Sequence, residues 1–561
     1  MLVDPLLALS ADPNKLQFVV LFAFSVTMLI WDTVEVGRND ASNLINSVYG
    51  ARLMTRRTAV RIAGAATIVG ALLAAGVIET ARKGIFKPSQ LQPEEAAAIY
   101  VSVYVVDTVL LYAYSSFGMQ VSTTACLVFE LLGASYAMSL LRGYSSVVQW
   151  SKAGTVVTAI VLSIFLAGFA AFVVQRLVRG IIQDKAEEVR TMLLHGTWIG
   201  GGMATGLSFF MILKGAQKVP AVEWLHGQID AFNNWLGGGT WHDPSKFKDV
   251  AEAAASGVQI VAGGVNVGMI ASVFLLWIFF GALIAVLVRR YRERAAQRVF
   301  PVLATLGMIA MAVAFGQNDL ANCASPGLAT INLLLHWDQG TAAATKADIT
   351  WYMLLGTGLL LFMGMRTKNA TRVTKTAVRM GSQTDHVGLY APRWCIAIAQ
   401  RLVTHRPGDA SLAPRSRFTE RGKRIHFDPL RATVIMCISA SVIAMASSYK
   451  LPVSTTYVTF AAIVGSGMGD RVFEQGDAAL KMARAIWIVF SWFMAAAIAA
   501  VFTGIVCLII HFAGLFGLAA TIGLNLYLRR IFRDRGDAQT RRTREELMER
   551  RHPERYATEF E

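Results

Sequence analysis

The sequence predicts an all-α polytopic membrane protein of two inverted repeats, with broken or re-entrant helices at the midplane and about 12 transmembrane segments. Three observations support this prediction. The chain has 561 residues, 54% of them hydrophobic, and its apolar runs of about 20 residues can each cross ~30 Å of hydrocarbon. Two short polar motifs recur in the same order in both halves. The basic residues, which give a net charge of +16, cluster in a few blocks, as in cytoplasmic loops.

The first repeated motif is G-x-N-D-x-x-N, at residues 37–43 and 316–322. Each copy closes an apolar run, residues 16–36 in the first half and 301–315 in the second. Polar and ionisable residues at that depth are costly in a bilayer, and they usually face a cavity or a substrate path. One copy alone would be typical of a capping turn, but a matched pair favours a functional site.

The second repeated motif is V-S-T-T, at residues 121–124 and 453–456. Each copy opens an apolar run, where a serine or threonine is typical of a helix N-cap. A helix N-terminus also offers unpaired backbone N–H groups and a partial positive charge to an anion. Two such termini facing each other could enclose a tetrahedral oxyanion, and duplicated halves point to a transporter.

Apolar runs separated by charged stretches predict the individual spans. In the first half and the connecting region, these spans are residues 16–36, 58–78, 96–117, 121–141, 153–178, 199–213 and 255–288. In the second half, they are residues 301–315, 350–365, 433–448, 453–468, 485–510 and 513–528. With the N-terminus outside, and if both segments that begin with Ser-Thr-Thr fully cross the membrane, every basic block is expected in the cytoplasm and the two halves in opposite orientations.

These spans predict seven parts of the chain. They are an N-terminal extracytoplasmic segment (1–15), a first transport repeat (16–178), a connecting region with two spans and a tryptophan-containing outer loop (179–300, loop 215–250), the first part of the second repeat (301–365), a basic cytoplasmic insert (366–430), the second part of that repeat (431–528) and a charged cytoplasmic tail (529–561).

The duplicated motifs resemble those of the inorganic phosphate transporter (PiT) family, over roughly residues 16–145 and 300–470. Residues 78–85, which include Glu79, are similar to a third motif of that family's first half. The chain departs from the family pattern at four positions. Gln120 replaces a proline, Ala125 and Tyr457 stand where many members have histidine, and Asn369 lies near an expected glutamate.

The resemblance implies a transporter that imports inorganic phosphate by symport with H⁺ or Na⁺, alternating between two inverted repeats. The expected substrate-binding residues are Asn39, Asp40, Asn43, Ser122, Thr123, Thr124, Asn318, Asp319, Asn322, Ser454, Thr455 and Thr456. The expected coupling-ion residues are Asp40, Asp319 and Glu79, and the two aspartates would ligate Na⁺ in a sodium-coupled protein.

The two motif aspartates need a neutralising partner, because carboxylates repel phosphate. Either Na⁺ or a proton could serve. The amide of Asn369 cannot carry a proton at neutral pH, so any glutamate-based step would involve the first half alone. We therefore favour proton symport from the sequence, with Glu79 as an additional carrier. Asp107 and Glu130 lie inside apolar runs, where a structural hydrogen bond and a proton relay are both open.

Two other functions stay open. A permease for sulfate or another oxyanion would use the same type of site. An integral membrane enzyme acting on a phosphorylated substrate belongs to a different class, but the sequence has no H-E-x-x-H motif, P-loop or nucleophile elbow, so no enzyme is expected. No cofactor beyond the coupling cation and no nucleic-acid partner are expected. We expect a multi-pass protein in the lipid bilayer of the cell membrane, the inner membrane in a Gram-negative cell, with a homodimer left open.

Overall fold

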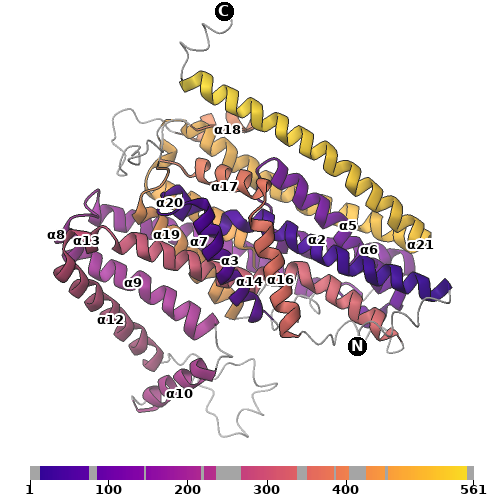
Figure 1. Ribbon diagram of the computed structural model, residues 1–561, viewed down its shortest axis with the longest axis horizontal. Helices are drawn as coiled ribbons and strands as arrows, with labels where there is room; N and C mark the ends of the chain where they lie inside the picture. The colour runs from indigo at the N-terminus through magenta and orange to yellow at the C-terminus, as the bar shows by residue number, and fades with distance from the viewer. Residues whose placement is uncertain are drawn as a thin grey trace, which may run out of the picture.

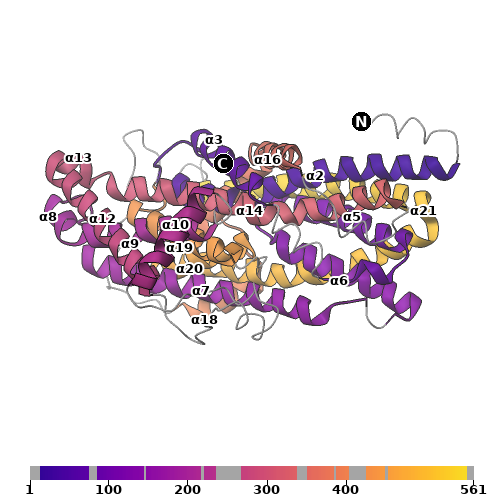
Figure 2. The ribbon, with the colours of Figure 1, turned by 90° about the horizontal axis from the view of Figure 1, so that it is seen from below.

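The computed structural model describes residues 13–74, 85–144, 147–215, 220–235, 267–337, 350–383, 387–403, 425–448, 453–474 and 476–551. These ranges are almost entirely helical, and their one β-bridge joins Phe86 to Val148. Glu79, Pro452 and much of the expected 215–250 loop lie outside the described residues. The helices form one elongated bundle, with α9 and α12 beside it at one end (Figures 1 and 2).

Within the described ranges, eight helices are long and apolar enough to cross a membrane. They are Phe18–Gly50, Pro93–Ser116, Thr123–Arg142, Trp150–Ile182, Gly268–Tyr291, Glu293–Leu335, Pro429–Ser447 and Ala478–Glu546, and the shorter apolar helix Trp351–Met365 accompanies them. The predicted all-α membrane fold is therefore confirmed.

Both copies of the Asn-Asp motif lie inside long helices rather than at helix ends. The first copy is in α2 (Pro13–Gly50), and the second is in α14 (Val299–Leu335). The sequence analysis expected each apolar run to close at the motif, and the helices continue for at least seven residues beyond it. They can do so because the motif side chains bond to groups on other helices, as described below, and do not compete for the helix's own backbone.

One helix ends and another begins around each Ser-Thr-Thr motif, and we call the non-helical segment just before the motif the break. Helix α5 (Pro93–Ser116) ends six residues before α6 (Thr123–Arg142) begins. Likewise, α19 (Pro429–Ser448) is followed by α20 (Thr455–Gly469). The hydroxyl of Ser122 accepts the backbone N–H of Ala125, and these N-caps begin the new helices as the sequence predicted.

The two halves of the chain interlock. Helix α3 (Arg56–Leu72) packs on α14 of the other half, and α16 (Trp351–Met365) packs on α2. The glycines that open the two motifs permit this contact. A Cβ atom on Gly37 would lie 2.1 Å from the carbonyl oxygen of Leu361, and one on Gly316 would lie 2.2 Å from that of Thr67. Small residues let helix backbones approach closely in membranes, so these glycines serve helix packing.

The same exchange of partners continues in the later helices. Helix α7 (Trp150–Ile182) packs against α20, and α6 packs against α21 (Ala478–Arg551). The chain of α21 reverses at Gly514, where φ is 53°. As a result, both arms of α21, before and after Gly514, contact α5. Tyr114 donates to the carbonyl of Ser491 on the first arm, and Asn525 on the second arm donates to the carbonyl of Val105.

Two stretches outside the repeats are helical where the sequence predicted a loop and an insert. Part of the expected outer loop forms α10 (Pro220–Trp235), and it exposes Trp224 and Trp235. Within the basic region 366–430, the structure describes α17 (Lys368–Met380) and α18 (Arg393–Leu402). Helix α17 packs its apolar side against α2, so this part of the region belongs to the bundle.

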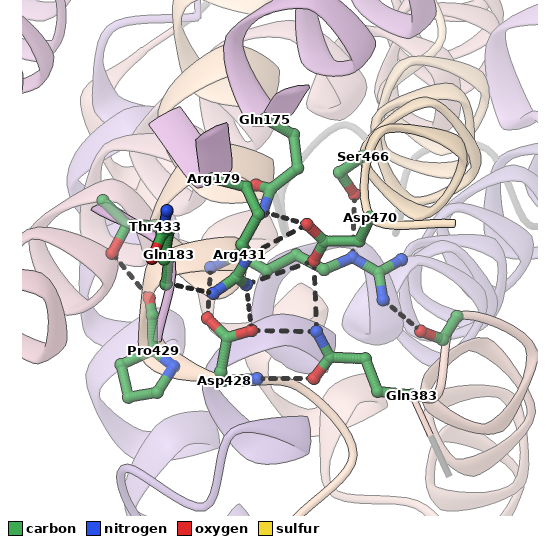
Figure 3. A network of polar contacts seen from close by, with 11 residues as sticks. Gln175, Arg179, Gln183, Gln383, Asp428, Pro429, Arg431, Thr433, Ser466 and Asp470 are labelled. Carbon is green, nitrogen blue, oxygen red and sulfur yellow. Dashed lines mark hydrogen bonds and ion pairs between the residues drawn. The ribbon is translucent and has the colours of Figure 1, made fainter. Parts of the chain in front are cut away.

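A buried ionic network joins three elements of the second half to α7 (Figure 3). The guanidinium of Arg179 donates to both carboxylate oxygens of Asp470, at 3.0 and 3.2 Å, and it also pairs with Asp428. Gln383 donates to both aspartates. Burial alone would raise the pKa of Asp428, but the charge of Arg179 and the hydrogen bonds from Gln383 and from the backbone of Arg431 hold that pKa below its ordinary value.

Replacing Arg179 with glutamine is expected to destabilise the protein by about 3–5 kcal/mol, because two buried carboxylates lose their cation. Since the pKa of Asp428 is lowered on folding, its stabilising contribution is present above its ordinary pKa and is lost as pH falls through the folded value. Thermal melts in detergent at pH 7 and at about pH 3, below the ordinary pKa of an aspartate, should therefore differ less in Arg179→Gln than in the wild type. Arg176→Gln, on the same helix outside the ion pairs, is the control, and equal melting temperatures for both variants would contradict this account.

Candidate functional site

The two Asn-Asp motifs and the two Ser-Thr-Thr motifs meet in one buried hydrogen-bond network. Helices α2 and α14 contribute the asparagines and aspartates, and the first turns of α6 and α20 contribute the threonines. All twelve predicted substrate-binding residues are buried, each with 4% or less of its surface exposed. The sequence analysis named these residues from the repeated motifs and the family resemblance, and the fold brings segments more than 400 residues apart into contact.

Asp40 is held mainly by side chains from its own helix and from the second half. Its Oδ1 accepts hydrogen bonds from Thr456 (2.7 Å), Asn39 (2.9 Å) and Asn43 (3.0 Å). Its Oδ2 accepts a longer bond from Thr123, at 3.4 Å. The shortest bond therefore crosses from one half of the chain to the other.

Asp319 repeats this arrangement with the halves exchanged. Its Oδ1 accepts from Asn322 on its own helix at 2.8 Å and from Thr124 of the first half at 3.3 Å. Asn322 also donates to the hydroxyls of Thr124 (2.8 Å) and Thr123 (3.1 Å). Each aspartate is thus bonded to a threonine hydroxyl supplied by the opposite half.

The first asparagine of each motif donates a hydrogen bond to the non-helical segment that precedes the threonine helix of its own half. Asn39 donates to the carbonyl of Val121 at 2.6 Å, and Asn318 donates to that of Val453 at 2.7 Å. The same carbonyls accept from the threonines of the other half, with Thr456 bonded to Val121 and Thr124 to Val453. These two valine carbonyls belong to the site, and the sequence analysis missed them because a main-chain group leaves no mark in a motif.

Several oxygen atoms of the site have no hydrogen-bond donor among the described residues. They are Asp319 Oδ2, Asn318 Oδ1 and Asn322 Oδ1. The hydroxyl of Thr455 faces Asp319 but forms no hydrogen bond of good geometry. A buried unpaired acceptor costs free energy, and oxygen atoms that lack donors are the ligands that a hard cation prefers.

The two motif serines have the capping role that the sequence predicted, which is compatible with the substrate-binding role expected of them. Ser122 caps α6 and Ser454 caps α20, with the Ser454 hydroxyl accepting the backbone N–H of Tyr457 at 3.1 Å. At the two positions where the resembled family often has histidine, Ala125 is buried, and the ring of Tyr457 lies 4.0 Å from that of Trp492. The expected coupling residue Glu79 lies outside the described residues, and Asn369 donates to the hydroxyl of Ser116.

A second group of carboxyls lies apart from the motif aspartates. Asp32 on α2, Asp107 on α5 and Glu130 on α6 are all buried, and the carboxyl of Asp107 lies close enough to the other two to interact with them electrostatically. Buried carboxyls close to one another are costly when charged, and a proton neutralises such a group. The charged groups that act on these carboxyls include Asp40, and Glu35 and Arg529, which pair with each other. This group can therefore hold protons inside the bundle.

Two interlocked helical halves that build one buried polar site from both sides are typical of membrane transporters. The comparisons with known proteins agree with that class and refine it. The model of the phosphate transporter family matches residues 36–388 and 419–503. The chain belongs to the phosphate transporter family.

The relatives are distant but extend over nearly the whole chain. A candidate phosphate permease of Pyrococcus furiosus is 24% identical over 506 residues, which cover 89% of this chain and 97% of that protein. One from Haemophilus influenzae is 23% identical and covers 82% and 89%. A solved structure described as the sodium-dependent phosphate transporter is similar in fold, with a TM-score of 0.58, 18% identity, and coverage of 88% of this chain and 99% of that one.

Proposed function

We propose that this protein imports inorganic phosphate by symport with a cation, and that the buried motif network is its transport site. The observation that supports this most directly is the pairing of each aspartate with a threonine of the opposite half. Membership of the phosphate transporter family supports phosphate as the cargo over sulfate or another oxyanion. It also favours a carrier over an enzyme acting on a phosphorylated substrate.

The network suggests how cation and phosphate binding could be coupled. A threonine hydroxyl has one proton to donate, and two acceptors lie within reach of it here, Asp40 and the Val121 carbonyl for Thr456, and Asp319 and the Val453 carbonyl for Thr124. The bond to an ionised carboxylate is the stronger of the two. A cation that neutralises the carboxylate weakens this bond and leaves the hydroxyl free to donate to a phosphate oxygen. Phosphate would then bind well only with the cation present, which is the requirement for symport.

Na⁺ is the cation that the site geometry favours. The unpaired oxygens of Asp319, Asn318 and Asn322 are acceptors on one helix, and Na⁺ is held by several such oxygens. The similar solved structure is also described as sodium-dependent. The proton remains the second candidate, and one observation favours it, namely the buried carboxyls of Asp32, Asp107 and Glu130 described above. Glu79 stays a proposed additional carrier on that model.

Alternating access would require the two halves to separate at this site. The bonds from Thr456 to Asp40 and from Asn322 to Thr124 cross between the halves, so opening toward either side would break some of them. We propose the domain limits and the inverted orientation given by the sequence as the frame of this motion. The basic blocks at 289–300, 366–430 and 529–551 would then be cytoplasmic.

Uptake of labelled phosphate into proteoliposomes tests this function. With an inward Na⁺ gradient, uptake is expected to rise at least about tenfold over the rate without a gradient, because cation binding frees the site's donors. Excess arsenate should inhibit uptake and excess sulfate should not. Empty liposomes are the control. Uptake driven by an imposed pH gradient without Na⁺ would show that the coupling ion is the proton. Uptake of sulfate without uptake of phosphate would refute phosphate as the substrate.

A further inference from the structure

A second polar region, apart from the motif network, lies at the C-terminal end of α5. It is a cavity of about 850 Å³ between α17, the second arm of α21 and the turn at Phe117 and Gly118. Figure 1 shows α17 and α18 beside α21 in this part of the molecule. Cavities of 300–1,000 Å³ are of the size that binds small molecules.

The walls of this cavity, which we call the basic cavity, carry a concentrated positive charge. Helix α17 contributes Lys368, Arg372, Lys375 and Arg379, which recur every three or four residues and so occupy one face. Helix α21 contributes Arg484, Arg541 and Arg544, and among the described residues of the lining Asp537 is the only acidic one. Like charges on one helix face destabilise it unless an anion lies opposite them.

Arg484 is the buried element of this site. Its side chain is 2% exposed, and its Nη atoms donate only to main-chain carbonyls, those of Tyr390 (2.9 Å), Gly118 (3.3 Å) and Phe117 (3.4 Å). Its Nε has no partner among the described residues, and no carboxylate pairs with it there. A buried guanidinium without a counter-charge is costly, so an anion in the cavity would stabilise it.

Asp537 shows that the basic cavity accepts an anionic group. Its carboxylate pairs with Arg372 and lies 3.7 Å from Lys368. Arg379, in contrast, donates to the carbonyl of Gly388, and burial lowers the pKa of its guanidinium. In the described part of the lining, one carboxylate therefore faces seven cations, and most of the positive charge there has no acidic partner.

We propose that the basic cavity binds a phosphate-rich polyanion. Arginine matches phosphate oxygens with paired N–H donors, and several arginines on two facing helices suit a ligand with several phosphates. Two sources share this chemistry, a soluble polyphosphate or nucleoside triphosphate and the headgroup of an anionic lipid. A single transported phosphate ion fits less well, because it would leave most of these cations unpaired.

The basic cavity is connected to the transport site through one turn of chain. Arg484 holds the carbonyls of Phe117 and Gly118, and Arg372 donates to that of Ser116 at 3.4 Å. A few residues later, the carbonyl of Val121 accepts from Asn39 in the motif network. A polyanion bound to these arginines would therefore change which conformation is favoured by the non-helical segment before Thr123, and so alter transport. This second step rests on the proposed function, whereas binding itself does not.

Binding can be measured without transport. Tripolyphosphate is added to the full-length protein in a neutral detergent, and its affinity is taken from calorimetry and from the rise in melting temperature. The variant Lys375→Gln with Arg541→Gln is expected to bind at least about tenfold more weakly, because it loses two cations. Arg535→Gln changes an exposed arginine on the same helix outside the cavity and should bind as the wild type does.

The lipid source is distinguished by repeating the measurement in nanodiscs with and without cardiolipin. The cavity would be assigned to a lipid headgroup if cardiolipin stabilises the wild type but not the double variant, and if tripolyphosphate does not bind in detergent. If neither probe binds, or if the double variant binds both as the wild type does, the proposal is overturned. Uptake by the double variant then tests the connection to transport separately, since wild-type uptake with weakened binding would refute the connection and retain the site.

Discussion

Replacing either motif aspartate with asparagine is expected to reduce phosphate uptake by about 100-fold or more, because each carboxylate accepts several hydrogen bonds and would carry the cation. Asparagine keeps the shape of the side chain and an acceptor at Oδ1, so the bonds from Thr456 to position 40 and from Asn322 to position 319 can persist. The variants Asp40→Asn and Asp319→Asn should therefore fold. Initial uptake rates in proteoliposomes, at matched protein content, measure the effect.

The control for the aspartate variants is Asp534→Asn, which removes an exposed carboxylate from the tail helix, far along the chain from the motifs. It should transport as the wild type does. The cation dependence gives a second reading, because the remaining uptake of the motif variants should no longer respond to the cation gradient. An Asp40→Asn variant with wild-type uptake and an unchanged cation response would place the coupling site elsewhere.

Removing the hydroxyls that cross between the halves is expected to have the second largest effect. Thr456→Val and Thr124→Val keep the branched shape and remove the group that donates to the opposite aspartate. A hydrogen bond to a charged group contributes roughly 1.5–3 kcal/mol, so each variant should lose about ten- to a hundredfold in apparent phosphate affinity. The concentration dependence of uptake gives this affinity, and Thr456→Ser, which restores a hydroxyl, should recover most of it.

Thr459→Val is the matched control for the threonine variants. Thr459 lies on the same helix as Thr456, it is equally buried, and its hydroxyl has no hydrogen-bond partner among the described residues. Its replacement should leave the affinity for phosphate unchanged or nearly so. If Thr459→Val weakened transport as much as Thr456→Val, the effect would come from packing of α20 and would not support a hydroxyl contact with phosphate.

The sequence predicted the class of fold and the members of the candidate site, for a physical reason. A lipid environment allows only long apolar helices to cross it, so hydropathy identifies most spans. Polar residues inside such runs are costly and therefore stand out, and their repetition singles out the motifs at Asp40 and Asp319. The same reasoning located the caps at Ser122 and Ser454, because an N-cap is a local interaction.

Tertiary structure decided what depends on distant contacts. The sequence could not show that Asp40 pairs with Thr456 of the other half, or that α2 and α14 continue through their motifs. It could not bring Arg484 to the turn at Gly118, because these residues lie 366 positions apart. Local pattern fixes which residues are polar, capped or buried, whereas the pairing of helices depends on packing between surfaces that no short motif records. The carboxylate–hydroxyl exchange between the two halves is a property of that packing alone.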